Sequence, residues 1–209
     1  MTSAGLRGRK KIETARRLAS CAYALARDRG VDAVTTDEIA AAAGYSRRTV
    51  ANYFDGKAEA VVDGFFLTIG FPGQHLRHPD TVVTRPPVAT VDDLLDLAEH
   101  ALREVLGGPV VAELHAFARL VHDSTLLRPY LLGALRDLVL ETFKPDDVAS
   151  WEAAELLLGA IVGLVAVILE RLANPGERCA ALEPHELDAL LERAFGFLRT
   201  GFATHAPVR

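Results

Sequence analysis

Cysteine is scarce in this chain of 209 residues, which has only Cys21 and Cys179. Two cysteines are too few for a disulfide framework or a zinc site, and both are expected to be packing residues in alanine-rich helices. The motifs GxSxG, GxxxxGK[ST], HExxH and CxxC are absent as well. The sequence His122-Asp123-Ser124 is no triad, because adjacent residues of a helix point in different directions. We therefore expect no enzymatic activity, no metal and no cofactor.

Long hydrophobic runs are also missing. The longest uncharged apolar run covers residues 156–169, between Glu155 and Glu170. At about 1.5 Å per residue it spans about 21 Å, less than the roughly 30 Å hydrocarbon core of a bilayer. Such a helix is expected to be buried inside the protein or between subunits. The first eleven residues carry charges without an apolar stretch behind them, so we expect no export signal, no membrane partner and a cytoplasmic location.

Positive charge is concentrated at one end of the sequence. The whole chain has a net charge of −5, but residues 1–57 hold eleven Lys and Arg against six Asp and Glu, a net charge of +5. The remaining residues, 58–209, carry −10. A basic head on an acidic body is typical of a protein that contacts phosphates with one end only.

The periodicity of apolar residues predicts an all-α fold, because no stretch alternates with the period of a strand. Glycine, proline and capping residues place the helix ends. A connection containing four prolines is expected over residues 71–90. The expected helices cover residues 12–29, 36–43, 47–54, 57–69, 91–106, 110–123, 127–143, 148–172 and 184–203. We expect a three-helix DNA-binding domain at 1–57 and a larger helical domain for ligand binding and dimerisation at 58–209.

Residues 36–54 meet the physical demands of a helix-turn-helix motif. Thr35 and Glu38 have the spacing of a capping box, which satisfies free N–H groups where a helix starts. Gly44 can adopt the positive φ of a tight turn, and Ser46 can cap the next helix. Ala40 is small where two steeply crossed helices approach each other. The second helix of such a motif enters the major groove of DNA.

The exposed residues of that second helix are rich in hydrogen-bond donors. Arginine can contact guanine O6 and N7 together, and asparagine can pair with adenine. Arg48, Thr49 and Asn52 are therefore the predicted base contacts. Contacts to phosphates are expected from Lys57, which lies at a helix N-terminus, and from Thr36, Arg47 and Tyr53. The full predicted DNA-binding set is Thr36, Ser46, Arg47, Arg48, Thr49, Asn52, Tyr53 and Lys57.

The stretch at residues 35–61, TTDEIAAAAGYSRRTVANYFDGKAEAV, resembles the DNA-binding signature of the tetracycline-repressor (TetR) family. The matching residues are Thr36, Ile39, Ala40, Gly44, Ser46, Thr49, Tyr53, Phe54 and Lys57. Ala51 departs from the pattern, since many members have an aromatic residue there. The resemblance implies a homodimer that reads a pseudo-palindromic double-stranded operator, usually as a repressor. It also implies that a small-molecule effector bound in the larger domain moves the DNA-binding heads apart.

Two further groups of residues are candidates for sites in the larger domain. Polar residues among apolar ones could line an effector pocket, although a solvated face is the more frequent role for such residues. This group is His100, His115, Arg119, His122 and Tyr130. The glycines and apolar residues of the last two helices predict either a four-helix dimer interface or an intrachain core, and we favour the interface. This second group is Leu156, Gly159, Gly163, Val167, Leu191 and Phe195.

Some alternatives stay open at the level of sequence. Arg7, Arg9, Lys10 and Lys11 could form an arm that enters the minor groove or a solvated, disordered tail. An activator would share the same motif as a repressor. A helical protein-interaction module without specific DNA binding is a different class of function, and sequence-specific retention of DNA distinguishes the two. The apolar body favours a hydrophobic or amphipathic effector.

Overall fold

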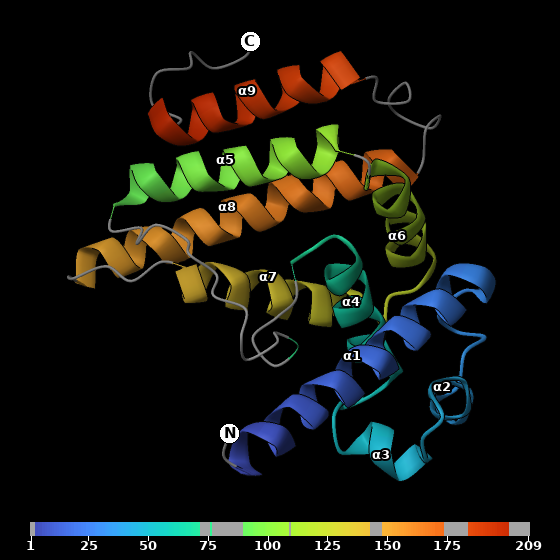
Figure 1. The fold of residues 1–209 in the computed structure, drawn as a ribbon. Coiled ribbons are helices and arrows are strands. Elements are labelled where there is room, and N and C mark those ends of the chain that lie inside the picture. Colours follow the sequence, from blue (N-terminus) through green and yellow to red (C-terminus); the bar gives the residue numbers. More distant parts are fainter. Residues whose placement is uncertain are drawn as a thin grey trace. The chain divides into compact units, whose positions relative to one another are not determined.

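The computed structural model describes residues 3–71, 76, 90–108, 110–142, 148–173 and 184–200. Within these ranges the regular elements are α-helices and no β-strand occurs, so the predicted all-α fold is confirmed. Figure 1 shows their arrangement. The helices are α1 (Ser3–Arg29), α2 (Thr36–Ala43), α3 (Arg47–Ala51), α4 (Lys57–Thr68), α5 (Val91–Gly107), α6 (Val111–Asp123), α7 (Arg128–Thr142), α8 (Val148–Ala173) and α9 (Pro184–Thr200).

Two helix boundaries differ clearly from the sequence-based prediction. α1 begins at Ser3 instead of residue 12, so the basic N-terminal stretch is helical, although it lacks an apolar stripe. α3 ends at Ala51 instead of residue 54, and Asn52 is its C-cap. Most of the predicted connection at 71–90, the predicted helix end at 201–203 and Cys179 lie outside the described residues.

The chain divides into two compact units, and each is described by itself. Unit 1 contains Met1–Thr84 and Ala116–Leu138, and unit 2 contains Arg85–His115 and Val139–Arg209. Unit 1 therefore includes α4 and parts of α6 and α7 in addition to the first three helices. The predicted boundary at residue 57 separates the helix-turn-helix motif from the rest of the chain and does not coincide with these units. The assignment of a DNA-binding and a ligand-binding domain on either side of it stays a prediction.

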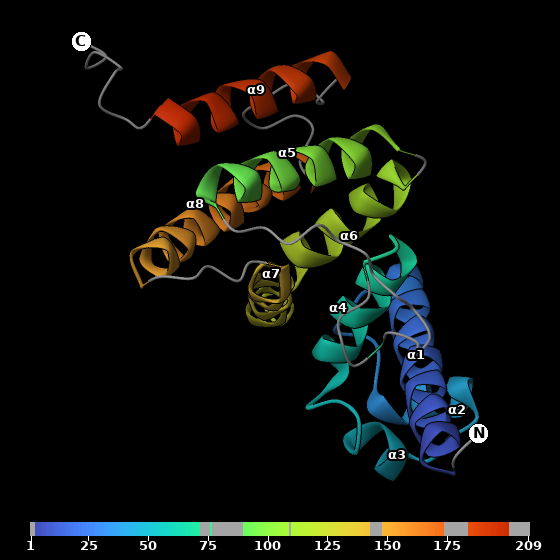
Figure 2. The same cartoon turned by 60° about the vertical axis from the view of Figure 1, so that its left-hand side comes forward.

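Unit 1 is built on the crossing of α1 and α4, which Figure 2 shows from the side. The helices approach closely at Gly64, where an added Cβ would overlap the backbone carbonyl of Ala19. Next to this crossing, Tyr23, Phe65 and Phe117 form an aromatic cluster. The rings of Phe65 and Phe117 are stacked with centroids 3.8 Å apart. Because Phe117 is fully buried, α6 supplies part of the core beneath the N-terminal helices.

A polar contact ties the α6–α7 turn to the α1–α2 turn within unit 1. The buried Ser124 donates from Oγ to Asp32 Oδ1 at 3.1 Å. Asp32 follows directly on Val31, which is buried just after the end of α1. A buried hydroxyl needs a partner to offset its lost hydration, so this contact fixes the position of the α1–α2 turn.

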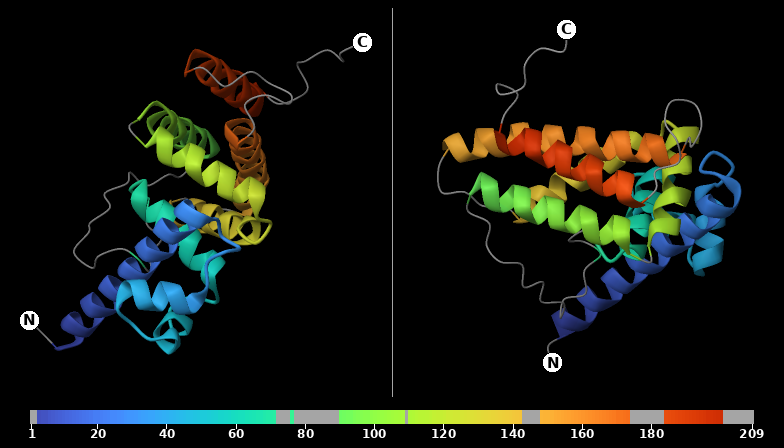
Figure 3. Two further views of the ribbon diagram at one scale, coloured as in Figure 1. Left: turned by 90° about the vertical axis from the view of Figure 1, so that its right-hand side faces the viewer. Right: turned by 90° about the horizontal axis from the view of Figure 1, so that it is seen from above.

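Unit 2 contains α5, α8 and α9 packed side by side, as the two views of Figure 3 show together with Figure 1. The nearly buried carboxylate of Glu99 on α5 pairs with Arg103 on α5 and with Arg199 on α9. Arg199 also pairs with Asp96. The hydrogen bond to Glu99, followed by the one to Asp96, raises the pKa of Arg199 above its ordinary value. This network joins α5 to α9 at one end of their contact.

The helix α8 contains a segment, Glu155–Ala173, that is apolar and long enough to cross a membrane by length and composition. The core helix of a soluble protein passes the same test. Leu157, Ile161, Ile168 and Leu172 lie on one buried face of this segment. Only 33% of the segment is buried within the chain, however, so a second apolar face lies outside the core.

Candidate nucleic-acid interface

The start of α2 is held by the predicted capping box, which the structure confirms. Thr35 Oγ1 accepts a hydrogen bond from the Glu38 N–H, and Glu38 Oε2 accepts one from the Thr35 N–H at 2.9 Å. Arg29 at the end of α1 donates to the other carboxylate oxygen of Glu38 at 2.8 Å. The hydrogen bonds from Arg29 and then from Thr35 lower the pKa of Glu38 from 4.5 to about 2. Glu38 thus connects the first two helices in its ionised form.

The turn between α2 and α3 depends on Gly44. Its φ of 78° lies in the left-handed region that favours glycine. The Gly44 N–H donates to the carbonyl of Ala41, and the Tyr45 N–H donates to that of Ala40 at 2.8 Å. These two bonds satisfy carbonyls left free at the end of α2, as in a Schellman motif. The turn therefore stops α2 and directs the chain into α3.

The short helix α3 is capped by Ser46 and anchored by one apolar residue. Ser46 Oγ accepts a hydrogen bond from the Thr49 N–H at 3.2 Å, which confirms the predicted cap. Val50 is 1% exposed and faces the core. Arg48 and Asn52 are exposed, while Thr49 is half-buried, with Oγ1 2.9 Å from Ser46 Oγ. The three predicted base contacts therefore lie on one short helix and its C-cap, and two of them are exposed.

Two of the predicted phosphate contacts have partners within the domain. Arg47 pairs with Asp37 of α2 at 3.5 Å, and both side chains are largely exposed. Lys57 donates from Nζ to the carbonyl oxygens of Asp32 at 3.1 Å and Val34 at 2.8 Å. Lys57 consequently holds the loop that precedes α2. This second role could not be predicted from residue spacing, because the partners of Lys57 lie more than twenty positions away.

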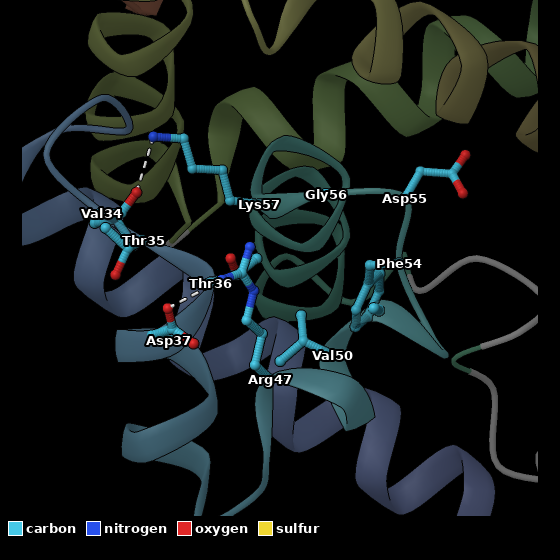
Figure 4. Close-up of a pocket in the computed structure, with 11 residues that line it drawn as sticks. Val34, Thr35, Thr36, Asp37, Arg47, Val50, Phe54, Asp55, Gly56 and Lys57 are labelled. Atoms are coloured by element: carbon cyan, nitrogen blue, oxygen red, sulfur yellow. Dashed lines mark hydrogen bonds and ion pairs between the residues drawn. The ribbon is translucent and has the colours of Figure 1, made fainter.

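A cavity of about 580 Å³ lies between α2, α3 and the start of α4 (Figure 4). Thr36 and Asp37 come from the first turn of α2, and Arg47 comes from α3. The N-cap of α4, Gly56, makes no side-chain capping hydrogen bond. Free N–H groups at a helix start attract anions. One N–H near this helix start is already bonded within the chain, since the Asp55 N–H donates to the carboxylate of Glu59. The residues that line the cavity are Val34, Thr35, Thr36, Asp37, Arg47, Val50, Ala51, Phe54, Asp55, Gly56 and Lys57.

Tyr45 is a residue of this surface that the sequence-based prediction missed. It is 37% exposed and immediately precedes the N-cap of α3. Thr14 Oγ1 on α1 donates to the Tyr45 hydroxyl at 3.3 Å. The two residues are 31 positions apart, so helical spacing could not reveal the contact. Through it, one face of α1 lies next to the start of α3.

The candidate effector residues occupy different surroundings. His100 is exposed on α5, 3.7 Å from the carboxylate of Glu104. His115 Nδ1 lies 2.8 Å from the carbonyl oxygen of Val111, one turn earlier on α6. Arg119 and His122 are exposed, and Tyr130 on α7 is half-buried. No group of three His, Cys, Asp or Glu residues in the described part of the chain could hold a metal ion. The effector pocket stays a prediction.

The candidate interface residues divide into an exposed and a buried set. Leu156 is 79% exposed and Val167 is 46% exposed, and Gly159 and Gly163 are exposed on the same face of α8. Leu191 and Phe195 of α9 are fully buried within the chain. The four α8 residues thus form an apolar face outside the core, whereas the two α9 residues are part of the core of the chain.

A capped helix, a glycine turn and a second short helix with exposed donors together define a helix-turn-helix domain. Residues 13–61 match the family model described as bacterial regulatory proteins, tetR family. A stretch of 127 residues is 32% identical to YdeS of Bacillus subtilis (strain 168), an uncharacterised HTH-type transcriptional regulator. That stretch covers 59% of this chain and 59% of the relative. The N-terminal part of the chain is therefore similar to the tetR family of regulatory proteins, as the sequence resemblance implied.

Proposed function

We propose that this protein is a cytoplasmic transcription regulator that binds a specific double-stranded operator and has no enzymatic activity. The observation that carries the proposal is the capped α2–turn–α3 motif within a match to the tetR family. α3 enters the major groove, where Arg48, Thr49 and Asn52 contact base edges. The exposure of Arg48 and Asn52 supports this assignment.

Phosphate contacts surround this base-reading helix. Ser46, Tyr53 and the cavity residues Thr36, Arg47 and Lys57 are assigned to the DNA backbone. The uncapped start of α4 supports the assignment, because its N–H groups and helix dipole favour an anion. The ammonium of Lys57 donates to two carbonyl oxygens and has a third N–H that a phosphate oxygen could accept.

The regulator acts as a homodimer. The exposed apolar face of α8 supports this, because a stripe of glycine and apolar residues on an otherwise packed helix suits close contact with a second copy. Two copies place two α3 helices on the two halves of a pseudo-palindrome.

A small apolar or amphipathic effector releases the protein from its operator, so that the protein acts as a repressor. This part of the proposal rests on the similarity of residues 13–61 to the tetR family and on the large helical body. His100, His115, Arg119, His122 and Tyr130 remain the candidate effector residues. Screening compounds for release of bound operator tests this step once an operator is known.

The central experiment is the selection of bound sequences from a random duplex pool by the purified protein. The oligomeric state is measured in the same buffer. The proposal expects enrichment of an inverted repeat by a dimer, which would also supply the probe for the effector screen. A folded dimer that enriches no sequence would contradict the proposal and favour a protein-interaction module.

A further inference from the structure

The N-terminal part of α1 carries exposed positive charge in a helix, not in an extended arm. Lys10, Lys11 and Arg17 are exposed on α1. No ion pair joins these three residues to a carboxylate among the residues that the structure describes. The nearest acidic residue along the helix is Glu13. We call Lys10 and Arg17 the α1 basic face.

The α1 basic face lies next to the start of α3. Lys10, Thr14 and Arg17 are spaced by four and three residues, so they share one side of α1. Thr14 is the residue whose hydroxyl donates to Tyr45, directly before the N-cap of α3. The N-terminal end of α1 and the helix α3 also lie at the same end of unit 1 in Figures 1 and 2. The basic face therefore continues the surface that carries the predicted base contacts.

We propose that the α1 basic face binds backbone phosphates of duplex DNA beside the base pairs contacted by α3. This inference rests on the proposed function and adds a third element to the interface. The distance along α1 from Lys10 to Arg17 is about 10 Å. Since each strand carries a phosphate about every 3.4 Å along the duplex axis, the face is long enough to reach about three of them.

The helical state of this segment decides between two ways of binding DNA. An extended basic arm can enter the minor groove, but that groove is only about 6 Å wide. An α-helix with its side chains is about 10–12 Å in diameter, so α1 does not fit into an undistorted minor groove. The α1 basic face thus binds phosphates from outside the groove, and its contribution is independent of the flanking base sequence.

The test compares two double variants with equal changes of charge. Lys10→Gln/Arg17→Gln removes two charges of the α1 basic face, and Arg128→Gln/Arg136→Gln removes two exposed charges of α7. Binding to the selected operator and to a scrambled duplex is measured by fluorescence anisotropy over a range of salt concentrations. Flanks rich in A·T and in G·C are compared, and thermal unfolding confirms that each variant folds.

For Lys10→Gln/Arg17→Gln we expect the slope of log K against log salt to fall by about two to four, since each lost phosphate contact contributes about 0.9 and a dimer has two heads. Affinity should fall at least tenfold on both duplexes and on both kinds of flank. The α7 variant should match the wild type. An unchanged slope in the α1 variant overturns the inference while leaving the proposed function intact.

Two other outcomes are equally informative. Loss of affinity confined to A·T-rich flanks would overturn phosphate binding from outside the groove and favour an arm in the minor groove. Absence of DNA binding by the folded wild type would overturn the proposed function, and the inference with it. In that case the α1 basic face would be a surface for another partner.

Discussion

At the scale of single residues, Glu38 combines local and tertiary roles. It completes the capping box with Thr35 and receives a hydrogen bond from Arg29, and these contacts lower its pKa to about 2. Because the pKa is lower in the folded chain than the ordinary value of 4.5, ionised Glu38 stabilises the fold above about pH 4.5. That contribution is lost as the pH falls towards 2.

This linkage gives a pH-dependent prediction. Glu38→Gln should lower the free energy of unfolding at pH 7, and its deficit relative to the wild type should shrink as the pH falls from about 4.5 to 2. Chemical denaturation at a series of pH values measures the difference. Glu104→Gln, on an exposed residue of α5, is the control and should leave the profile close to that of the wild type. A deficit that stays constant with pH would show that Glu38 does not act through its charge.

A second prediction at this scale concerns the choice of bases. Asn52→Ala should relax the preference at one position in each half-site, where the lost discrimination is about 1–3 kcal/mol. Lys57→Ala should instead weaken binding to cognate and scrambled DNA alike and flatten the salt dependence. Its unfolding must be measured as well, because Lys57 also holds the loop at Asp32 and Val34. Equal effects of the two variants on both duplexes would remove Asn52 from the base contacts.

At the scale of elements, two helical glycines in different surroundings give opposite predictions for substitution by alanine. Gly64→Ala places a Cβ against the backbone of Ala19 and should destabilise the protein by about 1–3 kcal/mol. Gly133 lies in α7 with open space around its Cα, so Gly133→Ala should stabilise the protein by about 0.5–1 kcal/mol through helix propensity. Urea denaturation checks both signs. Stabilisation by Gly64→Ala would mean that the two helices are farther apart than described.

The elements also show how far sequence reasoning extends. The ends of α2 and the start of α3 were predictable, because Thr35, Gly44 and Ser46 act through neighbours two to four residues away. The start of α1 was not, since residues 3–11 lack the apolar stripe by which a helix is recognised. The contacts of Tyr45 with Thr14 and of Lys57 with Val34 join residues more than twenty positions apart. Such contacts depend on the tertiary fold, which spacing does not report.

At the scale of the whole molecule, the apolar face of α8 predicts the oligomeric state. Leu156→Glu/Val167→Glu places charges at the centre of the proposed dimer contact and should yield a folded monomer with much weaker operator binding, because half-sites are then bound one at a time. Sedimentation equilibrium measures the mass. Leu132→Glu, at an α7 residue of similar exposure to Val167, should leave the dimer intact. A dimer that survives the α8 substitutions would place the interface elsewhere.

The stacking of Phe117 on Phe65 also limits how hybrid regulators can be built. The chain leaves unit 1 after residue 84 and returns at residue 116, so the compact head is not one continuous segment. A chimera that keeps only the first 84 residues would lose Phe117 and Ser124, and would thereby expose Phe65 and leave Asp32 without its hydroxyl partner. Exchanging unit 2 between related proteins therefore requires junctions on both sides of residues 116–138, so that this segment stays with the N-terminal helices of unit 1.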